Sequence, residues 1–305
     1  MPVSTSVHIT HALQQILRLG PSSILDVGCG FGLWGFLCRE YLDVMNERVW
    51  PDKWKVRIDG IELFEPYLMA HQRFLYSNLI VGDIRELAPN VDEYDLIITG
   101  DVIEHLHKDE GEAVLEALYA KAKKALLINI PLGDGWDHPE AYGNPGELHR
   151  SQWDPGDFLH FPNQYQPFQL PCGAYGVFYC PKDVLQTDKL NGRILAAQRQ
   201  ERLGNPARAI FHAERALEIT PDDKDLSSYV VNLKLESGDR QGALAILLEQ
   251  IERMKDFHVA YLAAARVLSV LGERDRAKDI LGRLLAQPGV DAEHVRKAEE
   301  LRARL

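Results

Sequence analysis

The sequence is poor in cysteine and has no long apolar run. Only four of its 305 residues are cysteines, and no two of them form a Cys-x-x-Cys pair, which argues against a zinc ribbon or a disulfide scaffold. No apolar run approaches the ~18 residues that a membrane-spanning helix needs. The first ten residues also lack the basic and apolar regions of a secretory signal. We therefore expect a reduced, cytoplasmic protein without a membrane partner.

Basic residues are scarce in the first part of the chain. Residues 1–189 contain 15 Lys and Arg against 27 Asp and Glu, whereas residues 190–305 contain 19 against 18. An acidic surface repels a polyphosphate, so we expect no nucleic-acid partner. The 46% hydrophobic content excludes disorder, and the length allows two domains.

Short apolar runs alternate with helical stretches in the first part. Runs that suit buried parallel strands lie at 23–27, 58–63, 79–81, 95–99 and 125–130. Helices are expected between them, at 33–41, 66–76 and 112–124. After a long loop that begins at residue 131, the segments 164–170 and 173–180 are expected to close the sheet as an antiparallel pair. The pattern predicts an α/β domain over residues 1–185, with a doubly wound, mostly parallel sheet.

A 34-residue repeat follows a linker at 181–188. Gly204, Gly238 and Gly272 lie 34 residues apart, and so do Ala209, Ala243 and Ala277. In each unit the Gly permits a tight turn between two helices, and the Ala lets these helices approach closely. This pattern, with Ala216-x4-Pro221 at the end of the first unit, resembles the tetratricopeptide repeat.

That resemblance implies an all-α helical repeat domain over residues 190–305, built of three 34-residue repeats and a capping helix at 291–305. An irregular helical bundle is the alternative. Because repeat arrays commonly hold a peptide or another subunit, the repeats predict contact with a protein partner or with a second copy of the chain.

The strongest local signal is the segment Asp26-Val27-Gly28-Cys29-Gly30-Phe31-Gly32. A strand enters a glycine-rich turn that opens a helix, an arrangement that lets the backbone approach a cofactor closely. A dinucleotide fingerprint needs a third glycine where Leu33 stands, which argues against a nicotinamide oxidoreductase. The observed spacing resembles motif I of the class I S-adenosylmethionine (SAM) methyltransferases.

Three further segments resemble motifs of this family, in the family's order. Asp59-Gly60-Ile61-Glu62 ends the second strand, and Gly82-Asp83-Ile84 follows the third. Residues 94–106 resemble a segment of small-molecule methyltransferases related to the ubiquinone-biosynthesis O-methyltransferases. The resemblance implies SAM as cofactor and S-adenosylhomocysteine as product, with Glu62 on the ribose hydroxyls. The implied cofactor-binding residues are Asp26, Gly28, Cys29, Gly30, Glu62, Asp83, Ile84 and Asp101. A turn or capping role is the alternative for each acidic residue.

The loop after the fifth strand is expected to cover the substrate. Residues 143–153 resemble a loop of some bacterial methyltransferases, in which Asn144 and Glu147 would make polar contacts and Trp153 an apolar contact. A base is needed where the acceptor must lose a proton, and histidine titrates near neutral pH. His149 and His105 are the candidate catalytic residues, with His138 and His160 as alternatives.

A metal site is not expected. Asp134, Asp137, His138 and His149 offer ligand atoms, but their spacing matches no compact metal motif. The sequence therefore predicts a SAM-dependent methyltransferase that acts on O or N of a small-molecule acceptor, in the biosynthesis of a secondary metabolite or glycan. Two alternatives stay open: a protein methyltransferase whose repeats recruit the acceptor, and a non-catalytic interaction scaffold. The composition does not identify the acceptor.

Overall fold

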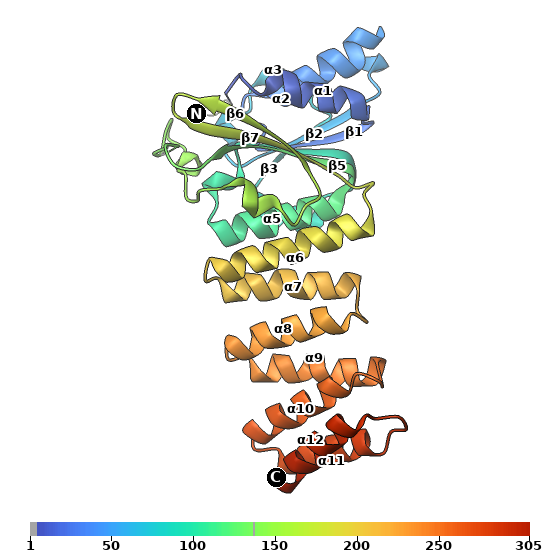
Figure 1. Ribbon diagram of the computed structural model, residues 1–305. Coiled ribbons are helices and arrows are strands. Elements are labelled where there is room, and N and C mark those ends of the chain that lie inside the picture. The colour runs from blue at the N-terminus through green and yellow to red at the C-terminus, as the bar shows by residue number, and fades with distance from the viewer. Residues whose placement is uncertain (1–4, 137) are drawn as a thin grey trace. The chain divides into compact units, whose positions relative to one another are not determined.

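A computed structural model describes residues 5–136 and 138–305, which form two compact units, Met1–Val184 and Leu185–Leu305 (Figure 1). Asp137, considered above as a metal ligand, lies outside the described residues. In the described parts of the chain, no helix combines the length and the apolar character that crossing a membrane requires.

The first unit is built on a seven-stranded sheet of order β3-β2-β1-β4-β5-β7-β6. The strands are β1 (Ser23–Val27), β2 (Arg57–Glu62), β3 (Asn78–Val81), β4 (Tyr94–Gly100), β5 (Ala122–Leu132), β6 (Gln164–Leu170) and β7 (Gly173–Pro181). β1 to β5 pair in parallel, whereas β7 is antiparallel to both β5 and β6. The predicted doubly wound, mostly parallel sheet with a closing antiparallel pair is confirmed.

Helices cover both faces of this sheet (Figure 1). They are α1 (Ile9–Leu19), α2 (Leu33–Cys38), α3 (Ala70–Leu75), α4 (Ile84–Leu87) and α5 (Lys108–Lys121). Successive residues of a strand point to opposite faces. Accordingly, Ile97 of β4 packs in a core with Leu115 of α5, whereas its neighbour Ile98 packs in a second core with Trp34 of α2.

The helices differ from the predicted ones. α1 and α4 have no predicted counterpart, and α2 ends at Cys38, where a π-helix (Arg39–Asp43) continues it. The helix expected at 66–76 is divided into a 3-10 turn (Glu65–Tyr67) and α3, because the Gln72 side chain binds the backbone of Tyr67 and Met69 between them. α5 starts and ends earlier than expected, and the chain enters β5 at Ala122.

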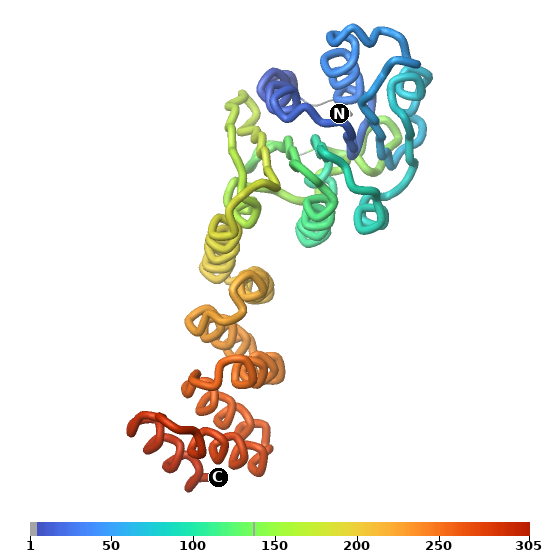
Figure 2. The backbone as a smooth tube through the Cα atoms, turned by 90° about the vertical axis from the view of Figure 1, so that its right-hand side faces the viewer, coloured from blue at the N-terminus to red at the C-terminus, as the bar shows by residue number. Residues whose placement is uncertain are grey.

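The second unit consists of seven helices within the described residues. They are α6 (Gln186–Arg202), α7 (Pro206–Ile219), α8 (Lys224–Glu236), α9 (Arg240–Arg253), α10 (His258–Val270), α11 (Arg274–Leu285) and α12 (Ala292–Ala303) (Figure 2). α6 begins inside the expected linker. Gly204, Gly238 and Gly272 adopt φ values of +73°, +87° and +82° in the turns after α6, α8 and α10. The three alanines at the same 34-residue spacing are fully buried. Turn and core therefore recur with the period of the sequence.

Candidate functional site

A cavity of about 1150 Å³ opens at the carboxyl ends of the parallel strands. Its walls come from the turn after β1, from the ends of β2 and β4, from the turn after β3 and from the loop after β5. Doubly wound sheets bind their ligands at this edge. Most small-molecule sites measure ~300–1,000 Å³, so the cavity is large enough for a small-molecule ligand.

The glycine-rich turn after β1 forms one wall of the cavity. The amides of Gly28 and Cys29 both donate to the carbonyl of Ile61, at 2.9 and 3.0 Å, which ties the turn to β2. Gly28 has φ +69°, and a Cβ there would overlap the side chain of Val102. The position therefore requires glycine for both its backbone conformation and its close approach to a neighbour. Gly28, Cys29 and Gly30 all line the cavity, as do Gly32 and the first residue of α2, Leu33.

Glu62, the last residue of β2, places a carboxylate in the cavity wall. Its Oε2 accepts from the Gly30 amide and its Oε1 from the Phe64 amide, both at 2.9 Å. Burial raises the pKa of this carboxyl group, and the two backbone donors oppose that shift. A carboxylate has about four acceptor positions, so each oxygen can still accept from a ligand hydroxyl.

Asp26 does not line the cavity, in contrast to the expectation from the sequence. Its carboxylate is 1% exposed and accepts from the hydroxyl of Tyr76 at 2.5 Å. The same hydroxyl accepts from the Gly35 amide in α2, at 3.1 Å. Asp26 therefore supports the glycine-rich turn from behind. Because Asp26 does not line the cavity, its carboxylate is not placed to contact a ligand there.

Asp83 and Ile84 line the cavity at the start of α4. The Asp83 carboxylate caps α4 through the Arg85 amide and pairs with the Arg85 guanidinium. This hydrogen bond from Arg85 lowers the pKa of Asp83. The capping role considered as an alternative is thus observed, at a residue that lines the cavity. Asp101, after β4, also lines the cavity, with φ +52° and a 2.8 Å hydrogen bond from the hydroxyl of Tyr175.

The loop after β5 contributes Asn144 and Glu147 to the cavity. The Tyr67 hydroxyl donates to Glu147 Oε1 at 2.9 Å and so connects this loop to the segment after β2. Trp153 is a different case. It is 1% exposed, stacks on Phe158 and packs over Gly111 of α5, so it belongs to the core and does not line the cavity. The expected apolar contact of Trp153 with a substrate is wrong.

The candidate histidines fall into different environments. His105 lines the cavity, and its ring lies 4.8 Å, centroid to centroid, from that of His149, which does not. Burial lowers the pKa of His105 to about 4 and also lowers that of His149. His138 lies beside His149, with centroids 5.5 Å apart. His160 is a buried residue next to Glu116 and does not line the cavity.

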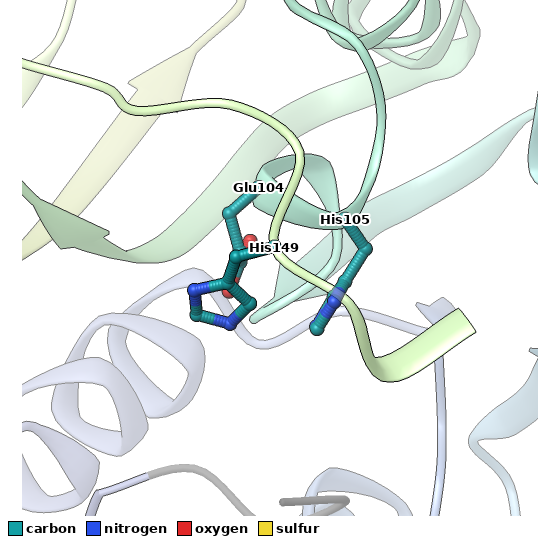
Figure 3. Close-up of side chains that lie close together, drawn as sticks. All are labelled: Glu104, His105 and His149. Carbon is teal, nitrogen blue, oxygen red and sulfur yellow. The ribbon is translucent and has the colours of Figure 1, made fainter. Parts of the chain in front are cut away.

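Glu104 is a residue of this region that the sequence analysis left without a role. Figure 3 shows its carboxylate next to the rings of His105 and His149. It was part of the segment 94–106, and its adjacency to His105 was a visible signal. Tyr67 and Tyr76 were also missed, and neither has a local signal because their partners lie 80 and 50 residues away.

No protein-family model matches the chain, and no curated protein matches it. Among solved structures, the chain is similar to TehB from Haemophilus influenzae, with 13% identity and a TM-score of 0.43 over 59% of this chain and 64% of that one. It thus spans a little under two thirds of that protein.

Two similar structures are methyltransferases with a bound cofactor or product. One is the magnesium protoporphyrin IX methyltransferase (ChlM) of Synechocystis PCC 6803 with bound SAM, with 14% identity and a TM-score of 0.40 over 58% of this chain and 82% of that one. The other is the 1,6-didemethyltoxoflavin-N1-methyltransferase of Burkholderia thailandensis with bound S-adenosylhomocysteine, with 18% identity and a TM-score of 0.39 over 58% and 78%.

Proposed function

We propose that the first unit is a SAM-dependent methyltransferase that acts on O or N of a small molecule. The observation that carries the proposal is the pairing of Glu62 with the glycine-rich turn. A buried carboxylate at the end of β2 is hydrogen-bonded to the Gly30 amide, and both line one cavity. This places an acceptor for two hydroxyls beside a backbone that a ligand can approach closely.

The residues of the cavity fit the cofactor. Glu62 would hold the ribose hydroxyls through its remaining lone pairs. Asp83 and Ile84 would face the adenine, and Asp101 would lie on the methionine side. Gly28, Cys29 and Gly30 would contribute backbone, since the two glycines have no side chain to fill the space. Burial raises the pKa of the Cys29 thiol, so this cysteine is a packing residue and not a nucleophile.

When bound, the cofactor supplies a methyl group on a sulfonium centre, which is a good leaving group. The chain's task is to hold the acceptor in line with that group and to exclude water. The loop after β5 suits this task because Asn144 and Glu147 line the cavity and the Tyr67 hydroxyl holds the loop in place. These residues would bind polar groups of an acceptor that belongs to the biosynthesis of a secondary metabolite or a glycan.

His149 and His105 stay candidates for the base that accepts a proton from the acceptor. Both rings are neutral at pH 7 because burial lowers their pKa values, so each has a free lone pair. A histidine whose pKa is about 4 is nevertheless a weak base. The assignment would be tested by His149→Ala, for which we expect turnover to fall ~10²-fold with unchanged cofactor affinity.

For the second unit we propose three tetratricopeptide-like repeats and a capping helix, α12. Support comes from the glycine turns and buried alanines that recur every 34 residues. Such an array would hold a protein partner or a second copy of the chain.

A calorimetric titration of the full chain with S-adenosylhomocysteine tests the proposed function. We expect micromolar binding, and we expect Glu62→Ala to weaken it by ~10-fold or more, because two hydroxyls lose their acceptor. The matched control is Glu65→Ala, an exposed carboxylate three residues away. Binding of NAD in place of S-adenosylhomocysteine would contradict the proposal.

A further inference from the structure

Three side chains with metal-binding atoms converge beside the cavity. Glu104 and His105 lie on the 3-10 turn Ile103–His105 after β4, and His149 lies on the loop after β5. One ligand atom of each residue lies within 4.8 Å of those of the other two. Figure 3 shows the carboxylate and the two imidazole rings directed into the same space.

The Glu104 carboxylate is the unusual member of this cluster. It is 2% exposed, and neither oxygen has a hydrogen-bond partner among the residues that the structure describes. Its acidic neighbours Asp101 and Glu147 add negative charge. Burial of an ionised carboxylate is costly unless a cation or hydrogen-bond donors compensate it. Among the described residues, this buried carboxylate therefore has no hydrogen-bond donor to compensate its charge.

Hydrogen bonds orient the His105 imidazole and hold the loop that carries His149. His105 Nδ1 lies 3.3 Å from the carbonyl oxygen of Leu148. With the proton on Nδ1 donated to that oxygen, Nε2 keeps its lone pair, which is the usual arrangement around metal-binding histidines. The amides of Arg150 and Ser151 both donate to the carbonyl of Glu104, at 2.8 and 3.1 Å, and so hold the loop that carries His149 against the turn.

We infer that Glu104, His105 and His149 bind a divalent transition-metal ion, with Zn²⁺ as the representative. Two imidazoles and one carboxylate are a ligand set for such ions, and they leave at least one coordination position open. Donor atoms around a tetrahedral Zn²⁺ are about 3.4 Å apart, given bonds of about 2.1 Å. The present spacing of up to 4.8 Å would have to shorten by at most about 1.4 Å on binding.

This assignment changes the roles expected from the sequence. With the metal bound, His105 and His149 would be its ligands and would not act as the base considered above, at a site where the sequence led us to expect no metal. Because His105 lines the cavity, the open position lies next to the proposed acceptor site. The metal would there bind an oxygen of the methyl acceptor, a step that rests on the proposed function. Metal binding itself does not depend on it.

A second cluster of the same residue types provides a control. His258, Asp291 and His294 in the helical unit also bring their ligand atoms within 4.8 Å of one another. There, however, Asp291 is exposed and already binds the His294 ring as well as the amides of Glu293 and His294, as the N-cap of α12. This cluster has no buried acceptor without a partner, so it carries no proposal.

The test is a titration of the chelator-stripped full chain with Zn²⁺, with metal content measured per chain. We expect one tightly bound ion, and we expect Glu104→Gln and His149→Ala each to weaken binding at least ~100-fold. His294→Ala should leave it unchanged. Zn²⁺ should also raise the melting temperature of the wild type and of His294→Ala, but not of the other two variants.

A footprint on the wild type answers the question without any variant. Zn²⁺ should protect His105 and His149 from diethyl pyrocarbonate, and His258 and His294 should stay reactive. Absence of tight binding, or tight binding that only His294→Ala removes, would overturn the inference. Glu104 would then be a protonated carboxylic acid. S-adenosylhomocysteine binding is measured in parallel, so that failure of the metal site and failure of the proposed function give different results.

Discussion

The hydroxyl of Tyr76 lies 2.5 Å from Oδ2 of Asp26, although 50 residues separate the two in the chain. Both side chains are buried beneath the glycine-rich turn. Burial raises the pKa of Asp26 to about 7, and the hydrogen bond from Tyr76 opposes part of that shift. The pair therefore stabilises the turn, but its carboxyl group is costly to ionise.

Asp26→Asn should stabilise the first unit at neutral and alkaline pH. The pKa of Asp26 is about 7 in the folded protein, whereas an unperturbed aspartate, as in the unfolded chain, has a pKa of 3.8. Between these two pH values the folded protein therefore binds one proton more than the unfolded chain. Wild-type stability from this group is present below pH 4 and is lost as the pH rises to about 7. The difference in the free energy of unfolding between the variant and the wild type should grow by about 3 kcal/mol from pH 5 to pH 8.

Urea denaturation followed by tryptophan fluorescence measures this difference, since all five tryptophans lie in the first unit. Tyr76→Phe is the matched variant. It removes the donor to Asp26 and the acceptor for the Gly35 amide, so it should destabilise the unit by ~1–3 kcal/mol. A pH-independent difference for Asp26→Asn would show that the carboxyl group does not titrate as described.

Gly28→Ala should abolish binding of S-adenosylhomocysteine. Its Cβ would overlap the Val102 side chain, and its φ of +69° is unfavourable for alanine. Gly133→Ala separates these two effects, because Gly133 has φ +71° but no atom within 4 Å of an added Cβ. The control should lose ~1–2 kcal/mol of stability and keep its binding. Equal binding by both variants, measured calorimetrically, would mean that the turn tolerates a side chain.

Local patterns predicted the sheet well, and long-range contacts account for what they missed. β1 and β6 begin and end at the predicted residues, because apolar or aromatic runs with clear breakers define a strand locally. Trp153 has the composition of a lid residue, and only its packing on Phe158 shows that it is in the core. The split near α3 depends on hydrogen bonds from one side chain, Gln72, which no periodicity reports.

The site follows the same division. The glycines are visible as a motif because neighbouring residues of β1 and the turn after it form it, and Glu62 is visible as the acidic residue that ends β2. Asp26 belongs to the same motif as the glycines, but its side chain binds Tyr76 and does not line the cavity. Which residues of the motif line the cavity depends on which side of the turn packs against α2 and Tyr76. Glu104 acquires its significance from His149, 45 residues later, through a loop that no local pattern could place.

Tyr67→Phe should loosen the loop after β5. The variant removes one hydrogen bond to the buried Glu147 carboxylate, at a cost of ~1–3 kcal/mol to the closed loop. We expect faster amide hydrogen exchange over residues 144–150, with little change elsewhere. Tyr142→Phe, an exposed tyrosine of the same loop, is the control. Unchanged exchange in Tyr67→Phe would show that other contacts hold the loop.

Two glycines of the helical unit should respond in opposite directions to alanine. Gly238 has φ +87° and open space around an added Cβ, so Gly238→Ala should cost ~1–2 kcal/mol through its backbone alone. Gly282 lies inside α11, also with open space, and Gly282→Ala should stabilise the helix by ~0.5–1 kcal/mol. Thermal unfolding followed by circular dichroism measures both. The same sign for the two variants would contradict the described turn.

A crystal structure of the chain with S-adenosylhomocysteine tests the central claim most directly. We predict density for the ligand in the cavity, with both ribose hydroxyls within hydrogen-bond distance of the Glu62 carboxylate and the adenine beside Asp83 and Ile84. Density for the ligand outside this cavity, or a bound ligand whose ribose does not reach Glu62, would contradict the account.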